Sequence, residues 1–130
     1  MSLADWSVYY IYNCRHTDPP KNKFAVIFLF PNNYLGFLIN SEIHPFIQRR
    51  NYLLPCIAKI KQATNPFLTH DSFTDCREML GFNSGELVDH RGGVCDTTKQ
   101  NIIKAVMACP VLELKYKNPL LERYGGLIDY

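Results

Sequence analysis

The stretch FAVIFLFPNNYLGFLINS, residues 24–41, decides the fold. Residues 24–30 are apolar on both faces of an extended chain, which is typical of a central strand covered on both sides. Pro31-Asn32-Asn33 stops this run, and residues 34–41 resume extended structure. Because the connection is too short for a crossover, the two strands are predicted to pair antiparallel.

Three further segments are predicted to be strands of the same sheet. Residues 6–12 are aromatic and β-branched, and the chain as a whole contains eight Tyr, eight Phe and one Trp, a bias that favours strands. Residues 52–60 form a second candidate, with Pro55 marking an edge or a bulge because proline cannot donate a ladder hydrogen bond. Residues 67–76 form the third, although residues 73–80 could instead form a capped helix.

Helix signals appear only late in the chain. Thr97 and Gln100 have the spacing of a capping box, and the apolar residues that follow predict a helix over 97–109. An asparagine cap, a proline at the first position and a glycine after the end predict a short helix over 119–124. The expected fold is therefore mainly β, a small antiparallel barrel or sheet with helices segregated to one end.

Size and composition set further bounds on the class of protein. The 130 residues are one domain's worth of chain, and a net charge of +2 is far from that of a strongly basic nucleic-acid binder. No apolar run approaches the ~20 residues of a membrane span, and no leader pattern opens the sequence. The five cysteines are odd in number and widely spaced, which favours buried, reduced thiols and a cytoplasmic protein.

Polar chemistry is concentrated in two segments, residues 36–44 and residues 67–76. Each begins as apolar strand material and then carries serine, histidine and acidic side chains, among them Ser41, His70 and Asp71. Strands with polar groups at their ends place a site on a rigid base. A different combination, Cys76 with His70 and an aspartate, would suit a thiol-dependent hydrolase, but a buried structural cysteine is the stronger expectation.

Other polar residues allow weaker interpretations. Arg49 and Arg50 lie among aromatic residues and could bind phosphate and stack on bases, or they could belong to a solvated loop. Arg91 precedes the predicted 97–109 helix, where it could contact an anion. The four histidines match no zinc template, so we expect no metal ion and no cofactor.

Four short stretches carry a resemblance to a known family. They are KFAVIF at 23–28, FLINS at 37–41, DSFTD at 71–75, and GGVCD at 92–96 with the helix that follows. Over roughly residues 5–110, the chain resembles the PemK/MazF-like toxin superfamily. The resemblance implies a small SH3-like β-barrel with a C-terminal helix.

The resemblance also implies an activity. Many members of the superfamily are metal-independent endoribonucleases that cut single-stranded RNA with an arginine and a Ser/Thr, which correspond to Lys23 and Ser41. Lysine supplies the charge but not the bidentate fork of arginine. With His70 as general acid or base and Asp71 beside it, these residues form the expected catalytic site. The expected partners are RNA, a second copy of the chain and an antitoxin protein. The alternative is a non-catalytic protein-interaction module on the same barrel.

Overall fold

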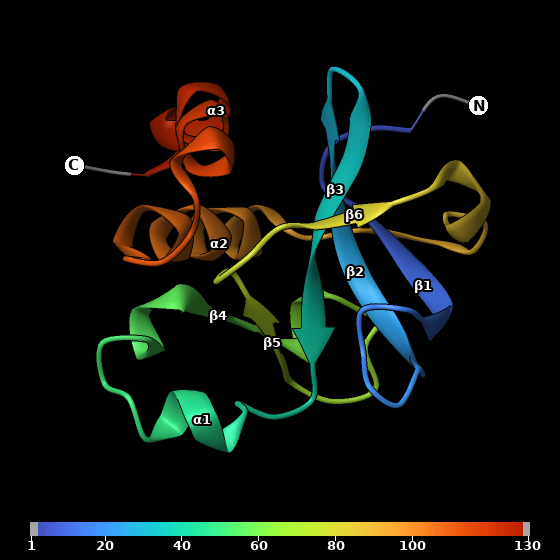
Figure 1. The fold of residues 1–130 in the computed structure, drawn as a ribbon, viewed down its shortest axis with the longest axis horizontal. Helices are drawn as coiled ribbons and strands as arrows, with labels where there is room; N and C mark the ends of the chain where they lie inside the picture. The colour runs from blue at the N-terminus through green and yellow to red at the C-terminus, as the bar shows by residue number, and fades with distance from the viewer. Residues whose placement is uncertain (1–2, 129–130) are drawn as a thin grey trace.

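The computed structural model describes residues 3–128 (Figure 1). The chain folds into a seven-stranded antiparallel sheet that curls into a half-barrel, and two C-terminal helices follow it. The strands are β1 Ser7–Cys14, β2 Lys21–Phe30, β3 Asn33–Asn40, β4 Ile57–Ile60, β5 Ser72–Asp75, β6 Leu80–Phe82 and β7 His90–Gly93. The helices are α1 Pro45–Gln48, α2 Asp96–Ala108 and α3 Leu114–Tyr124, and 3-10 turns occupy η1 Leu54–Cys56, η2 Gln62–Thr64, η3 Ser84–Glu86 and η4 Gly125–Leu127. The sheet order is β4-β5-β3-β2-β1-β7, with β6 pairing to β3. The predicted fold class is confirmed.

The β2–β3 hairpin forms the centre of the sheet, as the sequence predicts. Its antiparallel register runs from Phe24 opposite Ile39 to Phe30 opposite Asn33. Gly36 lies inside this hairpin, where a Cβ atom would approach the Val26 carbonyl oxygen to 2.5 Å. Only glycine therefore allows the two strands to pack this closely.

The C-terminal helices cover one face of the sheet and complete the main core. Trp6 joins the two layers, because its ring packs edge-on against Phe28 of β2 at 4.8 Å and Tyr124 of α3 at 4.9 Å. Asp5 accepts hydrogen bonds from the Leu29 amide at 2.7 Å and from the Tyr124 hydroxyl. Burial, together with Asp5, raises the pKa of Tyr124 to about 12, so this contact persists across the physiological pH range.

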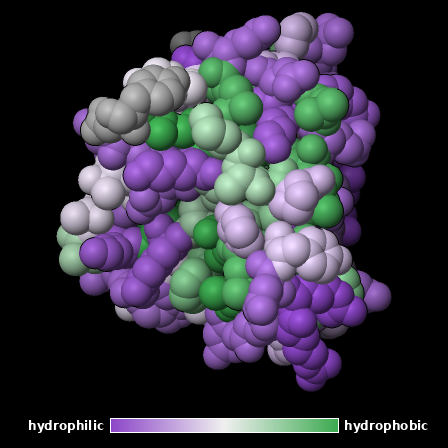
Figure 2. Space-filling view, turned by 90° about the vertical axis from the view of Figure 1, so that its left-hand side faces the viewer, coloured by the Kyte–Doolittle hydropathy of each residue, from purple (hydrophilic) through white to green (hydrophobic). Residues whose placement is uncertain are grey.

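On the side of the molecule that carries the helices, apolar side chains lie on the surface among hydrophilic ones (Figure 2). A cavity of about 450 Å³ opens there, with Phe46 of α1, Tyr52, Val111 and Tyr116 of α3 among its walls. None of the helices described over residues 3–128 is both long enough and apolar enough to cross a membrane.

Two predicted strands are shorter than their apolar patterns suggest. Residues 52–56 are not strand: they form a turn and η1, and only Ile57–Ile60 pairs, as an edge strand. Pro55 lies in the first turn of η1, where its missing N–H costs no hydrogen bond. Residues 67–71 are likewise a loop, and Ser72–Asp75 alone pairs, which rules out the alternative helix over 73–80.

Both predicted helices exist, but their N-termini differ from the prediction. Helix α2 begins at Asp96 with Cys95 as its cap, and Thr97 makes no capping box. Helix α3 begins at Leu114, so Pro119 lies inside it instead of opening it, and Gly125 keeps a right-handed conformation with φ of −56°. The sequence signals for both helix starts were therefore misleading by one or more residues.

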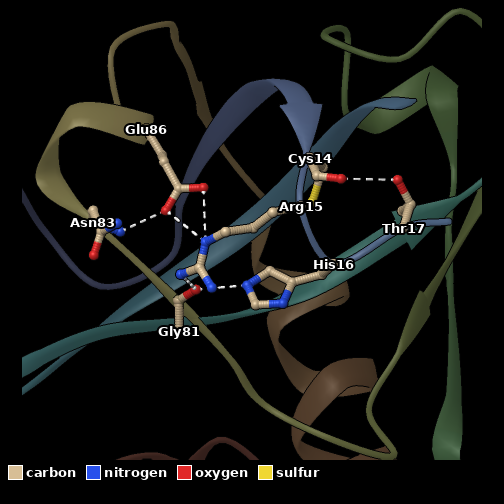
Figure 3. Close-up of polar contacts among 7 residues, drawn as sticks. All are labelled: Cys14, Arg15, His16, Thr17, Gly81, Asn83 and Glu86. Atoms are coloured by element: carbon tan, nitrogen blue, oxygen red, sulfur yellow. Dashed lines mark hydrogen bonds and ion pairs between the residues drawn. The ribbon is translucent and has the colours of Figure 1, made fainter. Parts of the chain in front are cut away.

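Strands β6 and β7 are too short to be predicted from the pattern, and side-chain contacts hold the β6 region in place (Figure 3). Arg15 and His16, in the loop after β1, both contact the Gly81 carbonyl oxygen, at 2.8 and 2.7 Å. Arg15 also pairs with Glu86 at 3.3 Å. The segment that carries β6 is thereby fixed against the sheet, and His16 has a structural partner.

Candidate functional site

A cavity of about 200 Å³ opens where β2 and β3 meet the loop before β5. Three of the residues singled out from the sequence line it: Lys23 from β2, Ser41 just after β3, and His70 from the loop. The antiparallel hairpin brings the start of β2 next to the end of β3, which explains why Lys23 and Ser41 meet. His70 arrives because β5 pairs with β3 on its other side.

Lys23 is the cation of this cavity. Its Nζ donates a 2.7 Å hydrogen bond to Oδ1 of Asn40, the residue across from it on β3. Burial, and next the charge of Lys21, lower the pKa of the Lys23 ammonium. The group therefore gives up a proton more readily than a solvated lysine does, and its remaining hydrogens are available to an anion.

His70 is held by its own neighbours in a defined tautomer. Its Nδ1 lies 3.1 Å from the Asp71 carbonyl oxygen and 3.3 Å from Oγ of Ser72. The Ser72 hydroxyl donates to the His70 carbonyl oxygen at 3.2 Å, so it accepts from the ring. The carbonyl oxygen can only accept, so Nδ1 carries the hydrogen and Nε2 keeps a lone pair. With Nδ1 donating, Nε2 is the ring nitrogen whose lone pair can accept a hydrogen from a bound ligand.

Asp71 contributes its main chain to the site, and its carboxylate points elsewhere. Oδ1 accepts a 2.9 Å hydrogen bond from the Gln62 amide, and Oδ2 lies 3.7 Å from Nζ of Lys59. The Gln62 hydrogen bond is the main cause that lowers the pKa of Asp71, with Lys59 adding to it. Asp71 is not among the residues that line the cavity. Its carbonyl group, which orients His70, is its contact with the site.

His44 joins the site although the sequence did not single it out as catalytic. An adjoining cavity of about 210 Å³ shares Lys23 and Ser41 with the first and is also lined by His44. Nδ1 of His44 accepts a 3.0 Å hydrogen bond from the Phe46 amide and so caps α1. With Nδ1 accepting, the ring hydrogen is on Nε2, which makes His44 a hydrogen-bond donor. A polar residue directly before Pro45 is the sequence signal that could have revealed this cap.

The two arginines predicted to bind RNA lie apart from these cavities. Arg50 stacks on the Phe46 ring at 3.6 Å and donates to the Phe46 carbonyl oxygen at 3.0 Å. Within the described residues, neither Arg49 nor Arg50 lines the cavity of His70 or that of His44. The structure therefore does not bring them together with Lys23.

No known family model matches this chain, and no curated protein shows significant similarity to it. The chemistry of the site is therefore inferred from the residues that form it.

The cysteines offer little support for thiol chemistry at this site. Cys14, Cys56, Cys76 and Cys109 are buried, which confirms the expectation for most thiols. Burial raises the pKa of Cys76 well above its ordinary value, so its thiol is protonated and inaccessible. Cys95 is half-buried at the start of α2 and is not among the residues that line the His70 cavity. Within residues 3–128, no group of three or more His, Cys, Asp or Glu side chains is arranged to hold a metal ion.

Proposed function

We propose that this chain is a PemK/MazF-like endoribonuclease that cleaves single-stranded RNA without a metal ion. The observation that carries the proposal is the convergence of Lys23, Ser41 and His70 on one cavity. RNA cleavage by its own 2′-hydroxyl needs a base, a proton donor and groups that stabilise charge on phosphate. Each of these can be supplied by a residue of the two adjoining cavities. The half-barrel with C-terminal helices also agrees with the SH3-like barrel that the resemblance implies.

In the proposed reaction, Nε2 of His70 removes the proton of the 2′-hydroxyl, and the 2′-oxygen attacks the adjacent phosphorus. The bond from phosphorus to the 5′-oxygen breaks, and the ammonium of Lys23 gives a proton to that leaving oxygen. The products are a 2′,3′-cyclic phosphate and a 5′-hydroxyl. The Ser41 hydroxyl and Nε2 of His44 donate hydrogen bonds to the non-bridging oxygens as their charge grows.

The test is cleavage of a single-stranded RNA oligonucleotide, labelled with a fluorophore and a quencher, in buffer that contains EDTA. Wild type is expected to cut, whereas His70→Ala and Lys23→Met each lose about 10²–10⁴-fold in rate, the usual loss for a proton-transfer group. Lys23→Arg keeps the charge and should recover part of the loss from Lys23→Met. Lys104→Met, on the exposed side of α2, is the matched control.

Circular dichroism of each variant separates loss of chemistry from loss of fold. If wild type leaves RNA intact under these conditions, or if folded His70→Ala cuts as fast as wild type, the proposal fails.

The proposal extends to partners. As in the superfamily that it resembles, the chain is expected to dimerise and to be neutralised by an antitoxin protein. Expression in a bacterial host should then arrest growth for wild type, and His70→Ala should relieve the arrest. Harmless expression of active wild-type enzyme would contradict the toxin role while leaving the ribonuclease role standing.

A non-catalytic interaction module is the second candidate, and one observation favours it. The 450 Å³ cavity on the helical side is lined partly by exposed apolar groups, Phe46, Tyr52 and Val111. Exposed apolar surface of this kind is a common feature of protein-binding sites. Binding of a protein partner that Tyr52→Ala abolishes, in a chain without ribonuclease activity, would favour this candidate.

A further inference from the structure

A continuous row of aromatic rings leads from the surface of β1 into the cavity of His70. Tyr12 and Tyr10 of β1 lie 5.2 Å apart, and Tyr10 lies 4.8 Å from Phe24, its cross-strand partner on β2. Phe24 in turn lies 5.4 Å from Phe67, in the loop that leads to His70. Tyr10 and Phe24 line the cavity themselves. We call Tyr12, Tyr10, Phe24 and Phe67 the aromatic strip.

Arg91 of β7 extends the aromatic strip with a flat cationic group. Its guanidinium lies 4.7 Å from the centre of the Tyr10 ring and 5.8 Å from that of Phe24. Asp89 holds Arg91 through two hydrogen bonds, of 2.8 and 2.9 Å, and also accepts one from the Tyr12 hydroxyl. Arg91, and next Tyr12, lower the pKa of Asp89 to about 2, so this carboxylate stays ionised at every physiological pH.

The Asp89 pair defines what Arg91 can do. The charge of Arg91 is balanced by the Asp89 carboxylate, so a phosphate that binds Arg91 would have to compete with a bidentate ion pair. Its plane is fixed and exposed, which suits stacking on another flat group. Tyr12 is 53% exposed, and every residue of β7 is exposed. The outer end of the aromatic strip therefore lies open to solvent, whereas a strip that served the core alone would be covered.

We propose that the aromatic strip with Arg91 binds the bases of single-stranded RNA by stacking, next to the nucleotide held at Lys23 and His70. This inference rests on the proposed ribonuclease function, because it assigns the strip to the bases that flank the scissile phosphate. Every base has a π-face, and aromatic rings with arginine planes are the groups that proteins use to bind single strands without reading a sequence. A base-paired duplex hides those faces and should bind poorly.

The inference predicts binding that depends weakly on salt. Lys21 and Lys23 both lie at the start of β2, and we expect these two lysines to neutralise about two phosphates of the bound strand. For single strands, the logarithm of the affinity falls by about 0.7 per neutralised phosphate for each tenfold rise in salt. A slope near −1.4 is therefore expected. A steep slope would indicate binding through phosphates over a wider basic surface.

The experiment measures fluorescence anisotropy of a labelled 2′-O-methyl RNA oligonucleotide, which cannot be cleaved because its 2′-hydroxyl is blocked. Tyr12→Ala should weaken binding about 10-fold, the order expected for one lost stacking ring. Arg91→Lys keeps the charge but loses the plane, and it should also weaken binding. Tyr52→Ala is the matched control, because Tyr52 is 60% exposed and lines the cavity on the helical side.

An abasic oligonucleotide of the same length should bind wild type and Tyr12→Ala equally. Equal binding of the 2′-O-methyl strand by wild type, Tyr12→Ala and Arg91→Lys would overturn the inference, as would undetectable binding by wild type. Neither outcome touches the ribonuclease proposal, which the variants at Lys23 and His70 test. Conversely, if the chain binds RNA bases through the aromatic strip but does not cut RNA, the ribonuclease proposal fails and the aromatic strip stands as an RNA-binding site.

Discussion

Replacing Asn65 with alanine should strongly destabilise the protein. Its side chain is fully buried between the loop that leads to His70 and the start of α2. Nδ2 donates to the Lys61 carbonyl oxygen at 2.9 Å and to Oγ1 of Thr98 at 3.0 Å. Oδ1 accepts from the Cys95 amide at 3.0 Å. One amide group thus joins two segments that are thirty residues apart in the chain.

The expected loss follows from these three hydrogen bonds. Each contributes about 1 kcal/mol net, and the partners left unpaired in a buried site add to the cost. Asn65→Ala should therefore lower the free energy of unfolding by about 3 kcal/mol, a large share of the ~5–15 kcal/mol that stabilises a typical domain. Water that enters the vacated space would reduce the loss, so 3 kcal/mol is the central expectation.

Urea denaturation followed by circular dichroism measures this loss. With a slope of roughly 1.5–2 kcal/mol per molar urea, the midpoint should fall by about 1.5–2 M. Asn51→Ala, in an exposed turn, is the control and should shift the midpoint little. The reasoning is refuted if Asn65→Ala loses less than 1 kcal/mol with an unchanged slope, because the three hydrogen bonds would then have no net value.

Two further predictions concern the hairpin and the start of α2. Gly36→Ala should lower the free energy of unfolding by about 1–3 kcal/mol or more in the same urea assay, because its Cβ would meet the Val26 carbonyl oxygen at 2.5 Å. Gly85→Ala is the control, because the space around Gly85 is open. Equal urea midpoints for the two variants would contradict the close approach at Gly36. For Cys95, burial raises the pKa, but hydrogen bonds with Thr98, Thr64 and Asn65 together outweigh burial and bring the pKa to about 7. Alkylation by iodoacetamide in the native state should therefore select Cys95 and rise with pH around a midpoint near 7, because the thiolate is the reactive form; a midpoint near 9 would contradict this.

Some parts of the candidate site were accessible from the sequence and others were not. Lys23 and Ser41 lie at the open end of a hairpin whose pairing follows from the apolar run and its short turn, so their proximity was predictable. The carboxylate of Asp71 was expected beside His70, but it turns to the Gln62 amide. His44 was passed over because only the folded chain places its cap beside Lys23.

The sequence by itself determined the centre of the sheet and the presence of the C-terminal helices, because both depend on patterns within about twenty consecutive residues. The tertiary structure decided the rest. The loop at residues 67–71 follows Asn65, whose buried side chain is hydrogen-bonded to Thr98 of α2. Strand β6 is held by Arg15 and His16, which come from a loop far away in the sequence. The aromatic strip likewise exists only once β1, β2 and β7 lie side by side. Contacts of this kind join residues that are far apart in the chain, and local periodicity carries no information about which distant partner satisfies a buried polar group or covers a ring.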